Sequence, residues 1–297
     1  MDTPHRPLAA ALWMSGSIVG FCAIAISGRE ISPDLDTFEM MLYRSVIGFA
    51  IILGWVLIAG RRSEISTRRL DLQLLRNLVH FAGQNLWLYA LLLIPMAQLF
   101  ALEFSSPIIV ALVAPFLLGE RLTPVRLLTA VLGFAGILIV ARPFGAGGLS
   151  VGLLVAIASA VSFAGAAILT KMLTRIVPVL NILFWLTLMQ TGFALVCAGW
   201  DFDIALPTAR ALPWVFVMGV GGIVAHLSLT KALSLAPATI VTPIDFLRLP
   251  LIAVVGMLFY AEPFDRWVLI GGAVIFVANW INLRAETRAT RSQIKIS

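Results

Sequence analysis

The sequence predicts an all-α membrane protein of ten transmembrane helices, arranged as two inverted-topology five-helix repeats. Three observations support this fold class. Of the 297 residues, 60% are hydrophobic and only 12% are charged, a balance that no soluble fold can bury away from water. Apolar stretches of the roughly 20 residues that a membrane span requires recur along the whole chain. The two halves of the chain also align with each other at a constant offset of 142 residues.

Ten apolar spans follow one another with mostly very short connections. They cover residues 8–28, 38–59, 72–94, 96–118, 124–141, 149–171, 179–198, 210–232, 238–260 and 265–283. The cationic start of the first span is similar to a signal peptide, but cleavage would remove the partner of span six, where Lys171 matches Arg29. We therefore assign residues 1–143 to the first repeat, 144–284 to the second and 285–297 to a basic cytoplasmic tail.

Loops rich in Lys and Arg are predicted to lie in the cytoplasm, because cations near the ends of spans stay inside. They follow spans two and six and form the tail, with Arg61, Arg62, Arg68, Arg69, Lys171, Arg175, Arg284, Arg288, Arg291 and Lys295. The opposite loops are acidic, with Asp34 and Asp36 after span one and Asp201 after span seven. Both termini are then cytoplasmic, in a bacterial-type inner membrane. Each half holds an odd number of spans, so the second half enters the membrane the other way up.

Spans four and nine are twins around which the chain is organised. Pro95–Glu120 and Pro237–Glu262 align without a gap, and each carries one acid at the same place, Glu103 or Asp245. Two prolines interrupt each segment: Pro107 and Pro115 in the first, Pro243 and Pro250 in the second. Such paired, proline-interrupted segments are typical of the substrate site of a secondary transporter. We predict a bend beside each acid, near Pro107 in one span and near Pro243 or Pro250 in the other.

The two acids are predicted to lie near the middle of the membrane. Each is about eight residues into its span, roughly 12 Å from the face where the helix begins, in an apolar layer about 30 Å thick. Charge at that depth marks a transport pathway or a relay. Arg248 follows Asp245 by three residues on the same helical face. Two interpretations stay open: a structural ion pair, or a site where Arg248 holds a substrate carboxylate or phosphate and Asp245 an amino group.

The remaining candidates are polar or aromatic side chains inside other spans: Arg44, His80, Gln84, Asn85, Trp87 and His226. The arginine either snorkels to the outer surface or faces the cavity. The two histidines either carry protons or hydrogen-bond neighbouring helices. The two amides line the cavity or join helices, and the tryptophan stacks on a ligand or belongs to the interfacial belt.

Several classes of function are disfavoured. The net charge of +6 lies in loops and tail, so it reports orientation and not a nucleic-acid surface. We find no nucleophile with its base, no pair of catalytic aspartates and no metal-binding motif, and we therefore expect no catalytic residue, metal or cofactor. The expected partners are the lipid bilayer and a small-molecule substrate. A proton or an exchanged metabolite as coupling partner, and a monomer or a homodimer, stay open.

Over nearly its whole length the chain resembles the drug/metabolite transporter superfamily, in its EamA-like branch of ten-helix carriers. The resemblance is carried by FEMMLYRSVIGF with Arg44, LWLYALLLIPMAQ with Tyr89 and Pro95, the run from Leu117 to Pro143, LTKALSLAPATIVTPI and FYAEPFDRW. The placement of Arg44, Lys231 and DFLRLP is similar to carriers that take up S-adenosylmethionine. The resemblance implies an inner-membrane secondary transporter that works by alternating access.

The substrate implied by this resemblance is a small polar or amphiphilic metabolite, either derived from an amino acid or similar to a nucleoside, with S-adenosylmethionine among the candidates. Alternatives in the same superfamily are an exporter of drugs or metabolites and a flippase of lipid-linked sugars. An intramembrane enzyme is the alternative from another class.

Overall fold

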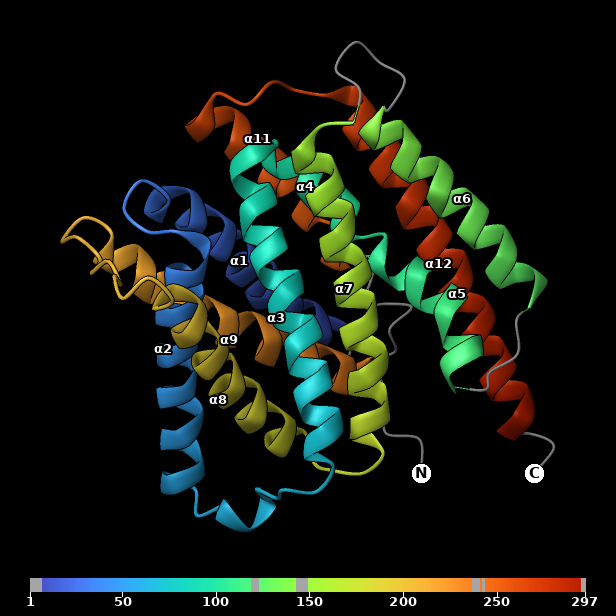
Figure 1. Ribbon diagram of the computed structural model, residues 1–297. Coiled ribbons are helices and arrows are strands. Elements are labelled where there is room, and N and C mark those ends of the chain that lie inside the picture. The colour runs from blue at the N-terminus through green and yellow to red at the C-terminus, as the bar shows by residue number, and fades with distance from the viewer. Residues whose placement is uncertain (1–6, 119–122, 143–148, 237–240, 242–243, 295–297) are drawn as a thin grey trace.

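The computed structural model describes residues 7–118, 123–142, 149–236, 241 and 244–294, and all regular structure in these residues is helical (Figure 1). The first half contains α1 (Pro7–Ile31), α2 (Thr37–Ile58), the short 3₁₀ helix η1 (Arg62–Glu64), α3 (Leu70–Leu93), α4 (Met96–Glu103), α5 (Ser106–Leu118) and α6 (Pro124–Ala141). The second half contains α7 (Val151–Thr174), α8 (Val179–Ala198), α9 (Leu212–Leu235), α11 (Arg248–Tyr260) and α12 (Arg266–Ile294).

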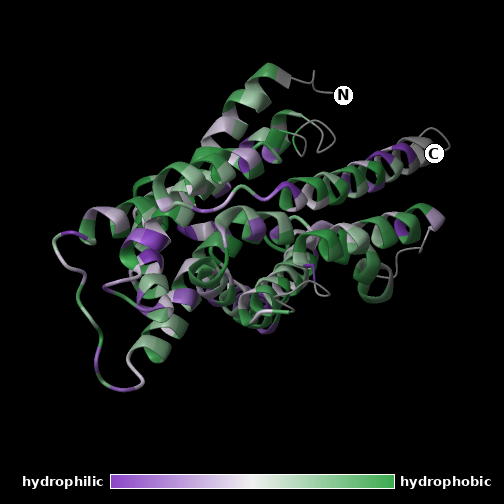
Figure 2. Cartoon of the chain, turned by 90° about the horizontal axis from the view of Figure 1, so that it is seen from above, coloured by the Kyte–Doolittle hydropathy of each residue, from purple (hydrophilic) through white to green (hydrophobic). Residues whose placement is uncertain are grey.

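Eight of the described helical segments are long and apolar enough to cross a membrane, and one of them joins α4 to the first part of α5. Of the predicted span 238–260, the structure describes residue 241 and residues 244–260, which include the shorter apolar helix α11. Figure 2 shows hydrophobic residues along most of the helices and more hydrophilic ones toward the C-terminal end of α12. The helix α12 extends through most of the predicted tail, to Ile294.

The helix α3 is not one of these eight segments, and a polar stripe runs along its buried face. Gln73, Asn77, Gln84 and Asn85 are buried, while Leu74, Leu75 and Leu78 are exposed. Polar residues spaced by three or four positions lie on one side of a helix. The helix therefore turns its polar side toward the protein and its leucines toward the surroundings, which is the pattern expected of a span that lines an interior.

The two halves pack against each other through helix pairs that each join one helix of the first half to one of the second. The first helix of one half lies along the third helix of the other, α1 on α9 and α3 on α7, while α2 packs on α8 and α6 on α12. Two glycines mark equivalent crossings: a Cβ on Gly20 would lie 2.9 Å from the Ala225 Cβ, and one on Gly83 would lie 2.9 Å from the Ser162 Cβ. These two pairs correspond at the offset of 142 residues. Small residues at helix crossings let backbones approach closely, and here the same close approach occurs twice.

Both twin spans are interrupted at equivalent places. The helix α4 ends at Glu103 and α5 begins at Ser106, just before Pro107, which confirms the bend predicted there. The carbonyl oxygen of Phe104, left over at the break, accepts a hydrogen bond from Asn279 Nδ2 at 2.7 Å. In the second half, residues 246 and 247 form a turn before α11 begins at Arg248.

In the second twin span, the sequence predicts a bend near Pro243 or near Pro250. Pro250 lies in the first turn of α11, where a helix tolerates proline, so the break precedes this residue. Pro243, like Pro237 and Glu120, lies outside the described residues.

Candidate functional site

A cavity of about 290 Å³ lies between α2, α3, α8 and α9. Its inner part is lined by residues from the middle of these helices: Arg44, His80, Gln84, Gln190 and His226. Its mouth lies at the end of the bundle where α2 ends and α8 begins, and is lined by Trp55, Arg61, Glu64 and Pro178. Pockets of this kind, apolar with a few converging polar groups, are typical binding sites for small molecules.

The polar groups of the inner cavity form a directed chain of hydrogen bonds. With the Gln84 amide oriented so that its oxygen faces Arg44, that oxygen accepts from Arg44 Nη1 at 2.7 Å, and the Gln84 nitrogen donates to Gln190 Oε1 at 3.0 Å. Gln190 Nε2 lies 2.7 Å from His80 Nδ1. This nitrogen of His80 is then the acceptor, so the ring is neutral and carries its proton on Nε2. One cation therefore organises two amides and an imidazole.

A second cluster, built around Arg248, contains the twin acids. Arg248 Nη2 lies 3.3 Å from Glu103 Oε1 and 3.5 Å from Asp245 Oδ2. Trp87 Nε1 donates a hydrogen bond to Glu103 Oε2 at 2.8 Å. The guanidinium is almost fully buried and also faces three aromatic rings, with its carbon 4.4 Å from the ring centroid of Phe21 and 4.9 Å from that of Phe104. The predicted pairing of Asp245 with Arg248 is present, and Glu103 of the other half joins it.

The two clusters are separated by one side chain of α1. The ring of Phe21 lies edge-on against His226, with the ring centroids 5.4 Å apart, and the guanidinium of Arg248 lies over the same ring. Glu103, Asp245 and Arg248 are not among the residues that line the cavity. The hypothesis that Asp245 and Arg248 contact the substrate therefore stays a prediction, whereas Arg44 faces the cavity and does not snorkel.

Two further candidates lie away from the cavity. Asn85 is buried on α3 and donates to the Phe81 carbonyl of its own helix at 2.9 Å. Tyr89 is 46% exposed. It is not among the residues that line the cavity.

Sequence reasoning missed several residues that complete these clusters. Gln190 joins the cavity chain, and Phe21 lies between the clusters. Arg76 forms a further network by donating to Thr170 Oγ1 at 3.0 Å and to Asn77 Oδ1 at 2.8 Å. Following the polar stripe of α3 toward its N-terminus at helical spacing would have found Arg76. No such signal marks Phe21, because an aromatic residue in an apolar span is indistinguishable from core.

The model of the EamA-like transporter family matches this chain twice, at residues 8–142 and 150–284. A riboflavin transporter of Rhizobium johnstonii is 29% identical over 296 residues, covering 97% of this chain and 95% of its own length. An S-adenosylmethionine uptake transporter of Rickettsia bellii is 26% identical, covering 95% and 96%. A pseudopaline exporter of Pseudomonas aeruginosa is 28% identical, covering 84% and 87%.

A solved crystal structure shares the fold with a TM-score of 0.65 at 19% identity, over 94% of this chain and 98% of its own. The twofold family match covers most of the chain, and the half-to-half packing agrees with its two repeats. The chain therefore belongs to the EamA-like transporter family and is a multi-pass membrane transporter of small metabolites.

Proposed function

We propose that this transporter carries a neutral or anionic metabolite with a planar polar ring, and that the flavin type of ring fits its cavity best. The observation that carries the proposal is the charge of the cavity wall. Arg44 places one guanidinium inside, whereas Glu64, the acid among the described lining residues, lies at the mouth and accepts from Arg61 Nη2 at 2.9 Å. An anionic or neutral substrate with acceptor atoms can accept a hydrogen bond from Arg44 in this cavity. A cationic substrate is repelled by the positive charge of the same guanidinium.

The carboxylates deep in the membrane do not change this balance. Glu103 and Asp245 both pair with Arg248 outside the cavity wall. S-adenosylmethionine carries a sulfonium cation and an ammonium group but only one carboxylate. Even if that carboxylate pairs with Arg44, desolvating the remaining positive charges in an inner cavity lined by Arg44 is costly. A neutral substrate avoids that cost, so we rank S-adenosylmethionine below flavins.

A flavin matches the polar groups that are present. Its imide edge alternates carbonyl acceptors with an N–H donor, which is the complement of a guanidinium flanked by amides. Its flat face fits the apolar part of the wall, which includes Trp55, Ile52 and Leu183. The riboflavin transporter among the relatives supports this class.

We also propose that the protein works by alternating access in the cell inner membrane, with both termini and the cavity mouth on the cytoplasmic side. The cation-rich loop after α2 supports this orientation, since it lies at the mouth. An exporter of a small metabolite is the second candidate function. A mouth toward the cytoplasm accepts substrate from inside, and one relative is named as an exporter.

Riboflavin fluorescence in the presence of the purified protein tests the substrate class. We expect saturable quenching that S-adenosylmethionine does not reverse. Arg44→Gln should weaken riboflavin binding about tenfold or more, since a hydrogen bond to a charged group contributes about 1.5–3 kcal/mol. Arg61→Gln, which removes a cation already paired at the mouth, is the matched control and should bind normally. Saturable binding of S-adenosylmethionine without any binding of riboflavin would overturn the assignment.

A further inference from the structure

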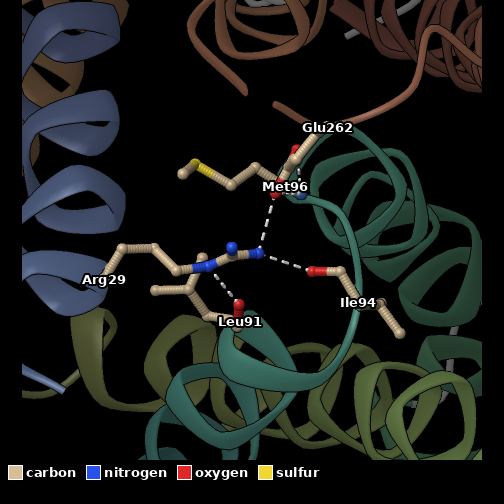
Figure 3. Close-up of polar contacts among 5 residues, drawn as sticks. All are labelled: Arg29, Leu91, Ile94, Met96 and Glu262. Carbon is tan, nitrogen blue, oxygen red and sulfur yellow. Dashed lines mark hydrogen bonds and ion pairs between the residues drawn. The ribbon is translucent and has the colours of Figure 1, made fainter. Parts of the chain in front are cut away.

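At the end of the bundle opposite the cavity mouth, a largely buried ion pair connects the two halves (Figure 3). The guanidinium of Arg29 on α1 donates from Nε to the Leu91 carbonyl at 2.6 Å. Its Nη2 donates to the Ile94 carbonyl at 2.8 Å and to Glu262 Oε1, also at 2.8 Å. The backbone N–H of Met96 donates to Glu262 Oε2 at 3.0 Å. The ends of α1, α3, α4 and α11 therefore meet at two side chains.

The local sequence builds this contact from both sides. Pro95 separates α3 from α4, which leaves the last carbonyls of α3 and the first N–H of α4 without helical partners. A cation at a helix C-terminus and a carboxylate at a helix N-terminus are each favoured by the helix dipole. Arg29 occupies the first place and Glu262 the second, so charge, dipole and hydrogen bonding agree.

Glu262 is held in place by a tight return of the chain after α11. Ala261 adopts the left-handed conformation at φ 50°, and Glu262 N donates to the Gly256 carbonyl at 3.0 Å. The carboxylate then lies over Gly256, where an added Cβ would overlap Oε2 of Glu262. Only glycine leaves room for the acid at this point. A second hydrogen bond joins the ends of α11 and α1, from the Tyr260 hydroxyl to Glu30 Oε1 at 2.9 Å.

The contact is not an ordinary surface salt bridge. The Arg29 side chain is 20% exposed and that of Glu262 9%, whereas exposed pairs contribute little to stability. It fixes α11, the helix that follows the break at residues 246 and 247, to three helix ends of the first half. At the opposite end of the bundle the cavity is open.

We propose that Arg29 and Glu262 form a lock that closes the transporter at this end while the cavity is open at the other, and that the lock must break before the cavity opens here. This rests on the proposed alternating access, in which a half-helix swings about a break while its neighbours stay packed. The cost of separating the pair sets how rarely the protein visits the opposite state.

The lock depends on which of the two residues carries the positive charge, and not only on the presence of an ion pair. Arg29 faces two carbonyl oxygens, which need a donor, and Glu262 faces the Met96 N–H, which needs an acceptor. Exchanging the two residues keeps the ion pair but sets a carboxylate against carbonyls and a guanidinium against an N–H. The exchange Arg29→Glu with Glu262→Arg should therefore fail to restore the lock, whereas a simple ion pair would be restored.

A reporter cysteine inside the cavity tests the lock. Ser45 lines the cavity and is buried, so Ser45→Cys in a Cys22→Ala, Cys197→Ala background reports access. The probe is a membrane-impermeant methanethiosulfonate, applied to intact cells and to inside-out vesicles. With the lock intact, one of the two preparations should label slowly, and this identifies the locked face.

On the locked face, Arg29→Ala and Glu262→Ala should each raise the labelling rate about tenfold, equivalent to about 1.4 kcal/mol of the closing equilibrium. Arg142→Ala is the matched control. It removes an ion pair with Asp265 at the same end of the bundle, but that pair is half-exposed and joins α6 to the start of α12. Its labelling rate should stay at the starting value.

Equal labelling of the lock variants and the control, in proteins that elute as single species with unchanged melting temperatures, would reduce the contact to packing. If Arg29→Ala does not fold, the labelling rate of Glu262→Gln is measured instead. It keeps an acceptor for Met96 but loses the charge, and a rate no higher than that of the control would equally overturn the lock. Because labelling needs no substrate, failure of the flavin assignment leaves this test intact, and the reverse holds too.

Discussion

Phe104 and Phe246 occupy equivalent places in the two halves, 142 residues apart, and their rings touch with centroids 5.0 Å from each other. Each ring lies at the break of its own span. Phe246 also packs on Phe276 of α12, with centroids 4.6 Å apart. The two breaks are therefore in direct contact, and we expect a movement of one half-helix to displace the ring at the other break.

Removing either ring should uncouple the two breaks. Phe104→Ala and Phe246→Ala should each lower the melting temperature in detergent. The double variant should lose less than the sum, because an aromatic pair contributes about 0.5–1.5 kcal/mol beyond its buried area. A double-mutant cycle by thermal unfolding measures this difference. Strict additivity would show that the rings touch without energetic coupling.

A side chain added at Gly222 should move Arg44. A Cβ at this glycine would lie 3.2 Å from Arg44 Nε. Gly222→Leu should therefore displace the guanidinium from Gln84 and weaken ligand binding about tenfold or more, while the helix itself tolerates leucine. Riboflavin titration of the purified variant measures this.

Gly192→Leu on α8 provides the control for Gly222→Leu, since a Cβ at Gly192 would have no atom within 4 Å. It should bind as the starting protein does. Normal binding by Gly222→Leu would show that the position of Arg44 does not matter to the ligand.

Arg248→Gln should destabilise the protein more than Asp245→Asn. The arginine is 4% exposed and balances two acids, so its loss leaves two partly buried carboxylates without their shared cation, whereas the loss of one acid leaves one pair intact. Breaking a buried pair costs about 3–5 kcal/mol. Melting temperatures in detergent compare the two variants. An Arg248→Gln protein of normal stability that no longer binds ligand would instead place this arginine on the substrate.

Reporter fusions test the orientation. A reporter that is active only in the cytoplasm, fused after residue 297, should be active, and the same reporter inserted between Asp34 and Asp36 should be silent, as the loop charges require. Insertion at Ser66, in the cation-rich loop after α2, is the positive control. A silent C-terminal fusion with a normal expression level would contradict the orientation and move the cavity mouth to the other side.

The sequence alone predicted the parts of the structure that depend on chain-local rules. Hydrophobic length located the spans, and the repeat with its prolines located the break beside Glu103. It predicted only half of the ion cluster, because Asp245 and Arg248 are neighbours on one helix but Glu103 comes from 145 residues away. Helix rotation decided the rest: Gln84 and Tyr89 lie on the same helix, yet packing turns only Gln84 into the cavity.

The contact between Arg29 and Glu262 is another feature that the sequence alone could not predict. Arg29 was matched to Lys171, and Glu262 to Glu120, as copies of one another in the two repeats. Nothing in the sequence indicated that Arg29 and Glu262 are partners, because their contact spans 233 residues and depends on the left-handed residue before the acid. Internal symmetry shows which residues are equivalent, but contacts across the two halves need the fold.

The packing of the two halves against each other also fixes the order in which the protein can mature during synthesis. The polar stripe of α3 finds partners in the second half, where Thr170 accepts from Arg76 and Asn181 accepts from Gln73. Until the ribosome has delivered α7 and α8, this stripe has neither of those partners inside the bilayer. We therefore expect the first half to become stable in the bilayer only after these helices have been inserted.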